Sequence, residues 1–138
     1  VRALVLLWPV TSASSDWKSY ALYGGERFLT APLMKWMFGK YVSDPAQRGN
    51  DLMSPVRASA ERLRGLPATL IVVAENDILR DEGEAMGRRL DEAGVEVTTV
   101  RFNGVVHDWG MLNGFAALHP TRTLIRLVGS VLRDYLEK

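Results

Sequence analysis

The chain is organised around Leu70-Ile-Val-Val-Ala-Glu-Asn-Asp77, which is followed by a charged segment, a second apolar run and Gly104-Val-Val-His-Asp-Trp109. Residues 70–74 are apolar and rich in β-branched side chains, which is typical of a strand buried on both faces of a parallel sheet. Asp77 follows at the carboxyl end of this strand, where open α/β sheets place their functional groups. The stretch therefore predicts a buried strand that ends in an acid.

Residues 80–93 have the spacing of an amphipathic helix, with one apolar stripe made of Leu79, Met86, Leu90 and Ala93. Asp81 and Glu84 have the spacing of a capping box at its start, and Gly94 is a natural stop. A second strand is predicted over residues 95–102.

The turn at residues 104–107 ends in His107. Parallel strands that are joined by a helix end at the same edge of their sheet, so we expect Asp77 and His107 to lie together there. An acid that precedes a histidine is the order found in the catalytic triads of α/β-hydrolases.

Length and composition narrow the class of protein. The 138 residues suit one domain at most, and an apolar content of 47% is ample for a core. A net charge of +1, with scattered basic residues, argues against nucleic-acid binding. Cysteine is absent, so there is no disulfide framework and no thiolate nucleophile, and we expect neither a metal site nor a cofactor. The apolar runs are far too short to cross a membrane, so we expect a soluble, cytoplasmic protein.

Residues 3–8 are apolar at every position, which predicts a strand covered on both faces. Chain termini are usually polar and poorly ordered, so a central strand this early suggests that further chain belongs before it. An unpaired apolar strand edge would also be a template for association. We therefore expect an amino-terminal companion to this chain.

Residues 16–53 are the least regular part and are expected to form a cap-like or pocket-wall region. Within them, residues 31–42 predict a helix, with proline at a permitted first-turn position. Two interpretations of this helix stay open. As a surface helix it would pack an apolar stripe on the core; the stripe consists of Leu33, Trp36, Met37 and Tyr41. As a substrate-binding element it would line an apolar acyl pocket; the lining residues would be Met34, Trp36, Met37 and Phe38.

The last segment, from Pro120, predicts a helix that covers one face of the sheet with a regular apolar face; its members are Leu124, Ile125, Val128, Val131, Leu132, Tyr135 and Leu136. The order strand, irregular region, strand, helix, strand, helix is that of the back half of a doubly wound α/β domain. We therefore expect three parallel strands with flanking helices, and residues 1–138 as the carboxyl-terminal portion of a single domain.

Other polar residues compete with the Asp77–His107 pair or have plain structural interpretations. Asp81 is the competing acid, although it and Glu82 are more typical of charges that the helix macrodipole favours at a helix start. His119 precedes a proline and is expected to be exposed or capping, and Asp108 is expected to point away from His107. Ser14 and Ser15 are weak nucleophile candidates, because the sequence contains no Gly-x-Ser-x-Gly elbow.

Three blocks carry a family resemblance: Leu66-Pro-Ala-Thr-Leu-Ile-Val-Val-Ala-Glu-Asn-Asp-Ile-Leu-Arg-Asp-Glu-Gly-Glu84, Leu90-Asp-Glu-Ala-Gly-Val95 and Gly104-Val-Val-His-Asp-Trp109. Together with Trp8-Pro9 and Ser54-Pro55 they resemble the carboxyl-terminal part of the hormone-sensitive-lipase-like esterases, which are serine esterases and lipases of the α/β-hydrolase fold. The resemblance covers essentially the whole chain. Ile78, where the family often has proline, is a minor departure.

The resemblance implies that Asp77 is the triad acid, that His107 is the base and that the helix over residues 31–42 lies near the acyl pocket. In the family, a Gly-Asp-Ser-Ala-Gly-type elbow carries the nucleophile and a His-Gly-Gly motif forms the oxyanion hole. This sequence has neither motif. We expect both in an amino-terminal portion of the same enzyme.

The implied activity is hydrolysis of a small carboxylic ester through an acyl-serine intermediate. The isolated chain is expected to be inactive, because loss of a triad member leaves only the residual contribution of binding and the oxyanion hole. A non-catalytic binding module or inactive fragment on the same fold is the alternative, and another α/β-hydrolase chemistry, such as that of a peptidase or a lyase, is a third. Exposed strand or helix edges at this end of the fold would suit a homodimer.

Overall fold

The sheet has three parallel strands, and the central one carries the organising stretch. The computed structural model describes residues 1–137. The strands lie in the order β1 (Ala3–Leu7), β2 (Ala68–Asn76) and β3 (Val97–Val106). β1 pairs with β2 from Ala3 opposite Ala68 to Leu7 opposite Val72. All three strands therefore end at one edge, as the predicted α/β fold requires.

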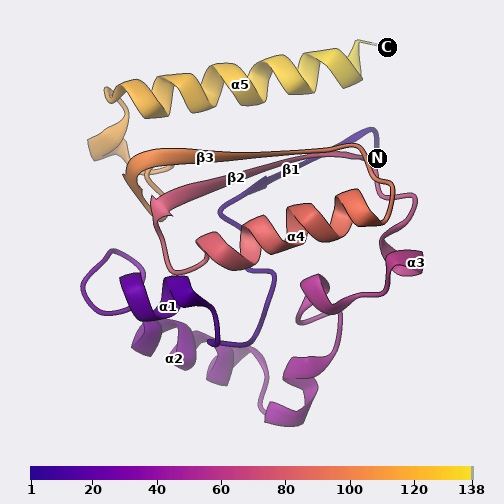
Figure 1. The fold of residues 1–138 in the computed structure, drawn as a ribbon. Coiled ribbons are helices and arrows are strands. Elements are labelled where there is room, and N and C mark those ends of the chain that lie inside the picture. Colours follow the sequence, from indigo (N-terminus) through magenta and orange to yellow (C-terminus); the bar gives the residue numbers. More distant parts are fainter. Residues whose placement is uncertain (138) are drawn as a thin grey trace.

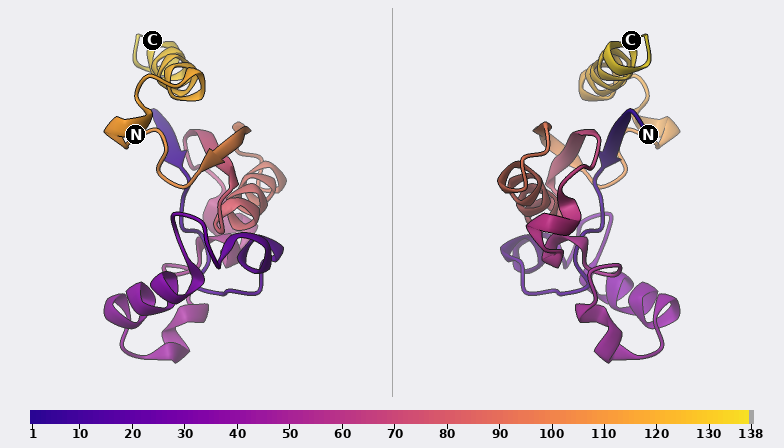
Figure 2. Two further views of the ribbon diagram at one scale, coloured as in Figure 1. Left: turned by 90° about the vertical axis from the view of Figure 1, so that its left-hand side faces the viewer. Right: turned by 90° about the vertical axis from the view of Figure 1, so that its right-hand side faces the viewer.

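Helices cover both faces of this sheet (Figure 1). α4 (Arg80–Glu92) lies on one face and α5 (His119–Leu136) on the other. Figure 2 shows that α2 (Ala31–Tyr41) lies at the opposite end of the molecule from α5. The remaining short elements are α1 (Lys18–Tyr23), α2 (Ala31–Tyr41), η1 (Pro45–Gly49), η2 (Pro55–Arg57), α3 (Ala60–Leu63) and η3 (Asn113–Phe115). Among the described residues, no helix has an apolar stretch long enough to cross a bilayer.

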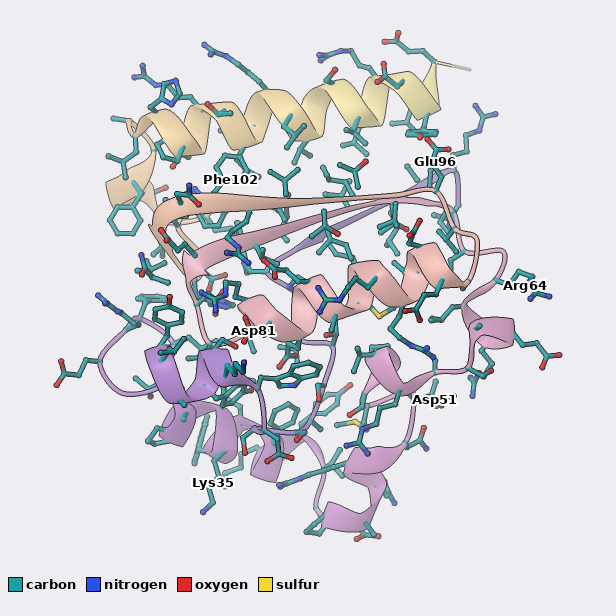
Figure 3. All side chains as sticks on the ribbon, in the orientation of Figure 1. Lys35, Asp51, Arg64, Asp81, Glu96 and Phe102 are labelled. Carbon is teal, nitrogen blue, oxygen red and sulfur yellow. The ribbon has the colours of Figure 1, made fainter. Side chains whose placement is uncertain are left out.

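Alternate side chains of β2 build two separate cores, because successive residues of a strand point to opposite faces. Ile71 and Val73 join a cluster on the α4 side that also contains Met86 and Leu90. On the α5 side, a second cluster contains Leu70, Val72, Ala74, Trp8, Trp109 and Leu124. Figure 3 shows Phe102 on this second face, toward α5. A third cluster, beneath the start of α4, contains Tyr20, Leu29, Met34, Ile78 and Leu79.

The predicted stripe on α4 is confirmed, since Leu79, Met86, Leu90 and Ala93 are all buried. The predicted capping box is wrong. Leu79 is the N-cap residue and makes no side-chain cap. Asp81 accepts a hydrogen bond from Ser19 N, and Glu84 pairs with Arg101. Both carboxylates therefore bind partners on other elements, and neither caps the helix.

The predicted packing of α2 is also wrong, because its stripe of Leu33, Trp36, Met37 and Tyr41 is exposed. The helix instead turns Met34 and Phe38 toward the third cluster. α5 differs less from the prediction. Leu124 is buried, whereas Ile125 and Leu136 face solvent. His119 is exposed at the first position of α5, and Leu118 is the N-cap residue.

Gly83 lies at a tight contact between α4 and β2, and Gly39 in α2 is a glycine without such a contact. A Cβ at Gly83 would lie 2.7 Å from Val73 Cγ1, whereas a Cβ at Gly39 in α2 would meet nothing within 4 Å. We expect Gly83→Ala to lower the free energy of unfolding by about 1–3 kcal/mol through overpacking. Gly39→Ala should raise it by about 0.5–1 kcal/mol, because alanine loses less backbone entropy in a helix. Urea unfolding of both variants measures the difference, and equal effects would contradict the packing described.

Candidate functional site

Asp77 and His107 meet at the carboxyl edge of the sheet. Asp77 follows β2 and His107 follows β3, and His107 Nδ1 lies 2.8 Å from Asp77 Oδ2. The Asp77 side chain is 1% exposed and that of His107 is 13% exposed. Because an ionised carboxylate only accepts hydrogen bonds, this geometry requires the proton on Nδ1. The lone pair of a neutral His107 is then on Nε2, where it can accept a hydroxyl proton.

The second carboxylate oxygen of Asp77 is also bound. Leu79 N donates a hydrogen bond to Asp77 Oδ1 at 2.9 Å, and Arg80 N donates to the main-chain oxygen of Asp77 at 3.2 Å. A buried carboxylate is stable only when its oxygens have partners. The turn into α4 therefore fixes the carboxylate in the position that faces His107.

An irregularity in β3 sets the position from which His107 projects. Phe102 pairs with Ala74 but Val106 pairs with Asn76, so residues 103–105 lie opposite Glu75 alone. Gly104 has a φ of +73° and donates its N–H to Glu75 Oε2 at 2.7 Å. Bulges of this kind bend a strand and re-aim the residues that follow. For this reason β3 extends to Val106, beyond the predicted end at residue 102.

An aromatic cluster contacts the histidine through Trp8. The rings of Trp8 and His107 meet edge to face with centroids 6.4 Å apart. Trp8 also lies 4.6 Å from Trp109, which in turn lies 5.3 Å from Phe102. Trp8 and Trp109 are both buried. The Trp8 ring therefore lies against the imidazole and is itself packed against Trp109.

Asp108 does not point away from His107, so that prediction is wrong. Asp108 Oδ1 lies 3.4 Å from His107 Nε2. The cause is the backbone at Asp108, whose φ of +59° lies in the left-handed region. This conformation turns the side chain back toward the ring.

Asp81, the competing acid, is held on the side of α1. It accepts hydrogen bonds from Ser19 N at 2.8 Å and from Arg80 Nε at 2.9 Å. Figure 3 shows Asp81 at the start of α4, next to α1. Arg80 also donates to the Tyr23 hydroxyl at 2.9 Å. Asp81 therefore fastens α1 to α4, while Asp77 holds the histidine.

Glu82 is the site-adjacent residue that the sequence analysis did not identify. It does lie in the first turn of α4, but its side chain is fully buried rather than an exposed helix-terminus charge. Its Oε1 accepts hydrogen bonds from Thr11 N at 2.7 Å and from Ser12 N at 2.9 Å. The available signal was its spacing, since Glu82 lies between Leu79 and Met86 on the buried stripe of α4.

Burial raises the pKa of Glu82 from 4.5 to about 8, against the opposing effect of the hydrogen bonds from Thr11 and Ser12. The negative charge of Asp77 nearby raises this pKa further. A pKa that is higher in the folded than in the unfolded state means that the folded protein holds a proton which the unfolded chain releases. The resulting stabilisation is complete below pH 4.5 and is lost as the pH rises through about 8.

We therefore expect Glu82→Gln, which cannot ionise, to flatten the pH dependence of stability. Wild-type Tm should fall relative to that of the variant between about pH 4.5 and about pH 8 and then level off. Differential scanning calorimetry across this range measures the effect. Glu92→Gln, an exposed carboxylate on the same helix, is the control and should keep the wild-type dependence. Parallel curves for wild type and Glu82→Gln would contradict the assignment.

A cavity of about 580 Å³ lies along α2. All four predicted substrate-binding residues border it; they are Met34, Trp36, Met37 and Phe38. The apolar lining also includes Met53 and Val10, which follows the end of β1. Lys40 adds one charged group to the lining. Asp77 and His107 are not among the lining residues. The structure thus gathers the predicted pocket residues around one cavity, beside the exit from β1.

A parallel sheet that places a buried aspartate behind a histidine at its carboxyl edge has the geometry of the acid-and-histidine part of an α/β hydrolase. Comparison with known proteins agrees, because residues 1–111 match the family Abhydrolase_3, described as having the alpha/beta hydrolase fold. The chain belongs to this family, that of the hormone-sensitive-lipase-like esterases. The resemblance and the fold class predicted from the sequence are thereby confirmed.

Several esterases show the same similarity. The chain is 37% identical over 108 residues to an ethyl acetate hydrolase of Pseudomonas putida, covering 78% of this chain and 33% of the relative. A crystal structure of a thermostable esterase from Pseudomonas putida has 45% identity and a TM-score of 0.95, covering 98% of this chain and 42% of that one. Carboxyl esterase 2 of Tuber melanosporum has 30% identity and a TM-score of 0.93, with coverage of 97% and 44%. The chain therefore spans less than half the length of these relatives.

Proposed function

We propose that this chain supplies the acid and the base of a serine carboxylesterase. The observation that carries the proposal is the 2.8 Å contact between His107 Nδ1 and the buried carboxylate of Asp77. The nucleophilic serine and the oxyanion hole would lie in a portion of the enzyme outside these 138 residues. Family membership and the partial coverage of its relatives support this division.

In the proposed reaction, His107 Nε2 takes the hydroxyl proton as the serine oxygen attacks the ester carbonyl carbon. The same nitrogen then gives the proton to the departing alkoxide, so that an alcohol leaves and an acyl-serine remains. A water molecule repeats the sequence, releasing the acid and restoring the serine. Throughout, Asp77 keeps the proton of His107 on Nδ1 and stabilises the imidazolium when it forms.

We further propose that the apolar cavity along α2 receives the acyl group of a small ester. Met34, Trp36, Met37 and Phe38 would supply apolar walls, which is the character that small-molecule sites usually have. The exposure of Trp36 and Met37 leaves this wall open to a ligand or to the proposed further portion of the enzyme. A cytoplasmic location and a homodimer stay predictions from the sequence.

A chimera tests the catalytic proposal. In it, these 138 residues replace the segment of the Pseudomonas putida esterase that they match, at 45% identity. We expect the chimera to hydrolyse p-nitrophenyl acetate and to react with a fluorophosphonate probe. Asp77→Asn should lower kcat by about 10⁴-fold, because the histidine loses its orienting partner. Asp81→Asn is the matched control and should stay within about tenfold of the unmodified chimera.

The 138-residue chain alone should show neither turnover nor fluorophosphonate labelling. Labelling of the isolated chain would place the nucleophile within it and contradict the proposed division. Full activity of the Asp77→Asn chimera would contradict the role of Asp77.

Acyl-chain selectivity tests the cavity in the same chimera. Met37→Trp places a larger side chain on the cavity wall, so we expect the kcat/KM ratio of hexanoate to acetate esters to fall by about tenfold or more. Leu22→Trp is the control, because Leu22 is exposed on α1 and does not border the cavity. An unchanged ratio for Met37→Trp would show that the acyl group binds elsewhere.

A further inference from the structure

The end of β1 contains a backbone conformation that needs external support. Trp8 has a φ of +38°, although bulky residues rarely adopt positive φ. Its N–H still donates to Val72 O at 2.6 Å, so the chain leaves the sheet abruptly at this residue. This turn directs the indole against Trp109 and against the edge of His107. Such conformations persist only where the surroundings impose them, and they gather at functional sites.

The support comes from Glu82 of α4, which binds the β1 exit loop at Thr11 and Ser12, three and four residues after Trp8. Besides the two hydrogen bonds from Thr11 N and Ser12 N to Oε1, the Thr11 hydroxyl donates to the main-chain oxygen of Glu82 at 2.9 Å. All three hydrogen bonds are buried and join residues about seventy positions apart. Gly83 adds close packing, since a Cβ there would lie 3.8 Å from Pro9 Cδ.

The same turn of α4 holds the acid. Asp77 Oδ1 accepts a hydrogen bond from Leu79 N, so Asp77 and Glu82 belong to one continuous turn-and-helix unit. This unit fixes Asp77 behind the histidine and, through Glu82, fixes the loop that carries Trp8. Val10, between Trp8 and Thr11, borders the cavity along α2. A shift of this loop would therefore change the packing against the imidazole and the shape of the proposed acyl pocket.

We propose that Glu82 is a positioning residue, which holds the β1 exit loop so that Trp8 keeps its left-handed conformation against His107. This inference rests on the proposed function for its effect on turnover, but the structural anchoring can be tested without it. Glu82 touches neither Asp77 nor His107 through a hydrogen bond in the described structure. Its influence passes through the loop.

The experiment compares three variants of the chimera: Glu82→Ala, Glu82→Gln and Leu90→Ala. Glu82→Ala removes the acceptor of both N–H groups, so we expect kcat to fall by about 10- to 100-fold from misplacement of the catalytic groups. Glu82→Gln keeps an amide oxygen at the acceptor position and should restore kcat to within about threefold. Leu90→Ala destabilises the buried core of the same helix by about 2–5 kcal/mol without touching the loop. It should leave kcat unchanged well below its Tm.

Near-UV circular dichroism distinguishes a positioning role of Glu82 from a general contribution to stability, because it reports on the packing of the tryptophan rings. The Trp8 and Trp109 rings, which pack at a tilt with centroids 4.6 Å apart, should produce a tryptophan signal that weakens in Glu82→Ala but is kept in Glu82→Gln and Leu90→Ala. A preserved signal in Glu82→Ala, or a loss of kcat no greater than that of Leu90→Ala, would overturn the proposal. An inactive unmodified chimera with the expected change in dichroism would contradict the esterase assignment while supporting the anchor.

Discussion

The candidate site depends on one buried carboxylate. Asp77 is removed from solvent at the end of the central strand, where an unpaired charge would be strongly destabilising. One of its oxygens accepts from Leu79 N and the other faces His107 Nδ1. The main chain at the start of the helix thus binds one carboxylate oxygen, and the other oxygen remains to accept a hydrogen bond from the histidine. An aspartate held in this way cannot turn away from the imidazole without losing a buried hydrogen bond.

The parallel sheet explains why residues 30 positions apart in the chain can meet. β2 and β3 end at the same edge, and the bulge opposite Glu75 adjusts where β3 releases His107. β1 ends beside them and contributes Trp8. Each strand therefore contributes one side chain to the pair or its surroundings, while α4 ties the three strand ends together through Asp77 and Glu82.

Much of this arrangement could be predicted from the sequence, because it follows from local patterns. The β-branched run of β2, the stripe on α4 and the order of Asp77 and His107 are all visible in the chain. Features that depend on backbone conformation were not visible: the left-handed φ of Asp108 turns its carboxylate toward the histidine. Burial by segments distant in the sequence could not be predicted either. Glu82 is buried and hydrogen-bonded only because the fold places Thr11 and Ser12 against it. The predicted packing of the α2 stripe is wrong because apolar spacing alone does not show whether another element covers a helix face.

Proton NMR of the histidine ring tests most directly whether Asp77 orients His107. A proton held between Nδ1 and a buried carboxylate should give a resonance far downfield of the amide region. We predict this resonance in the wild-type protein and in Asp108→Asn, and its loss in Asp77→Asn. Its persistence in Asp77→Asn, or its loss in Asp108→Asn alone, would contradict the assignment of Asp77 as the residue that orients His107.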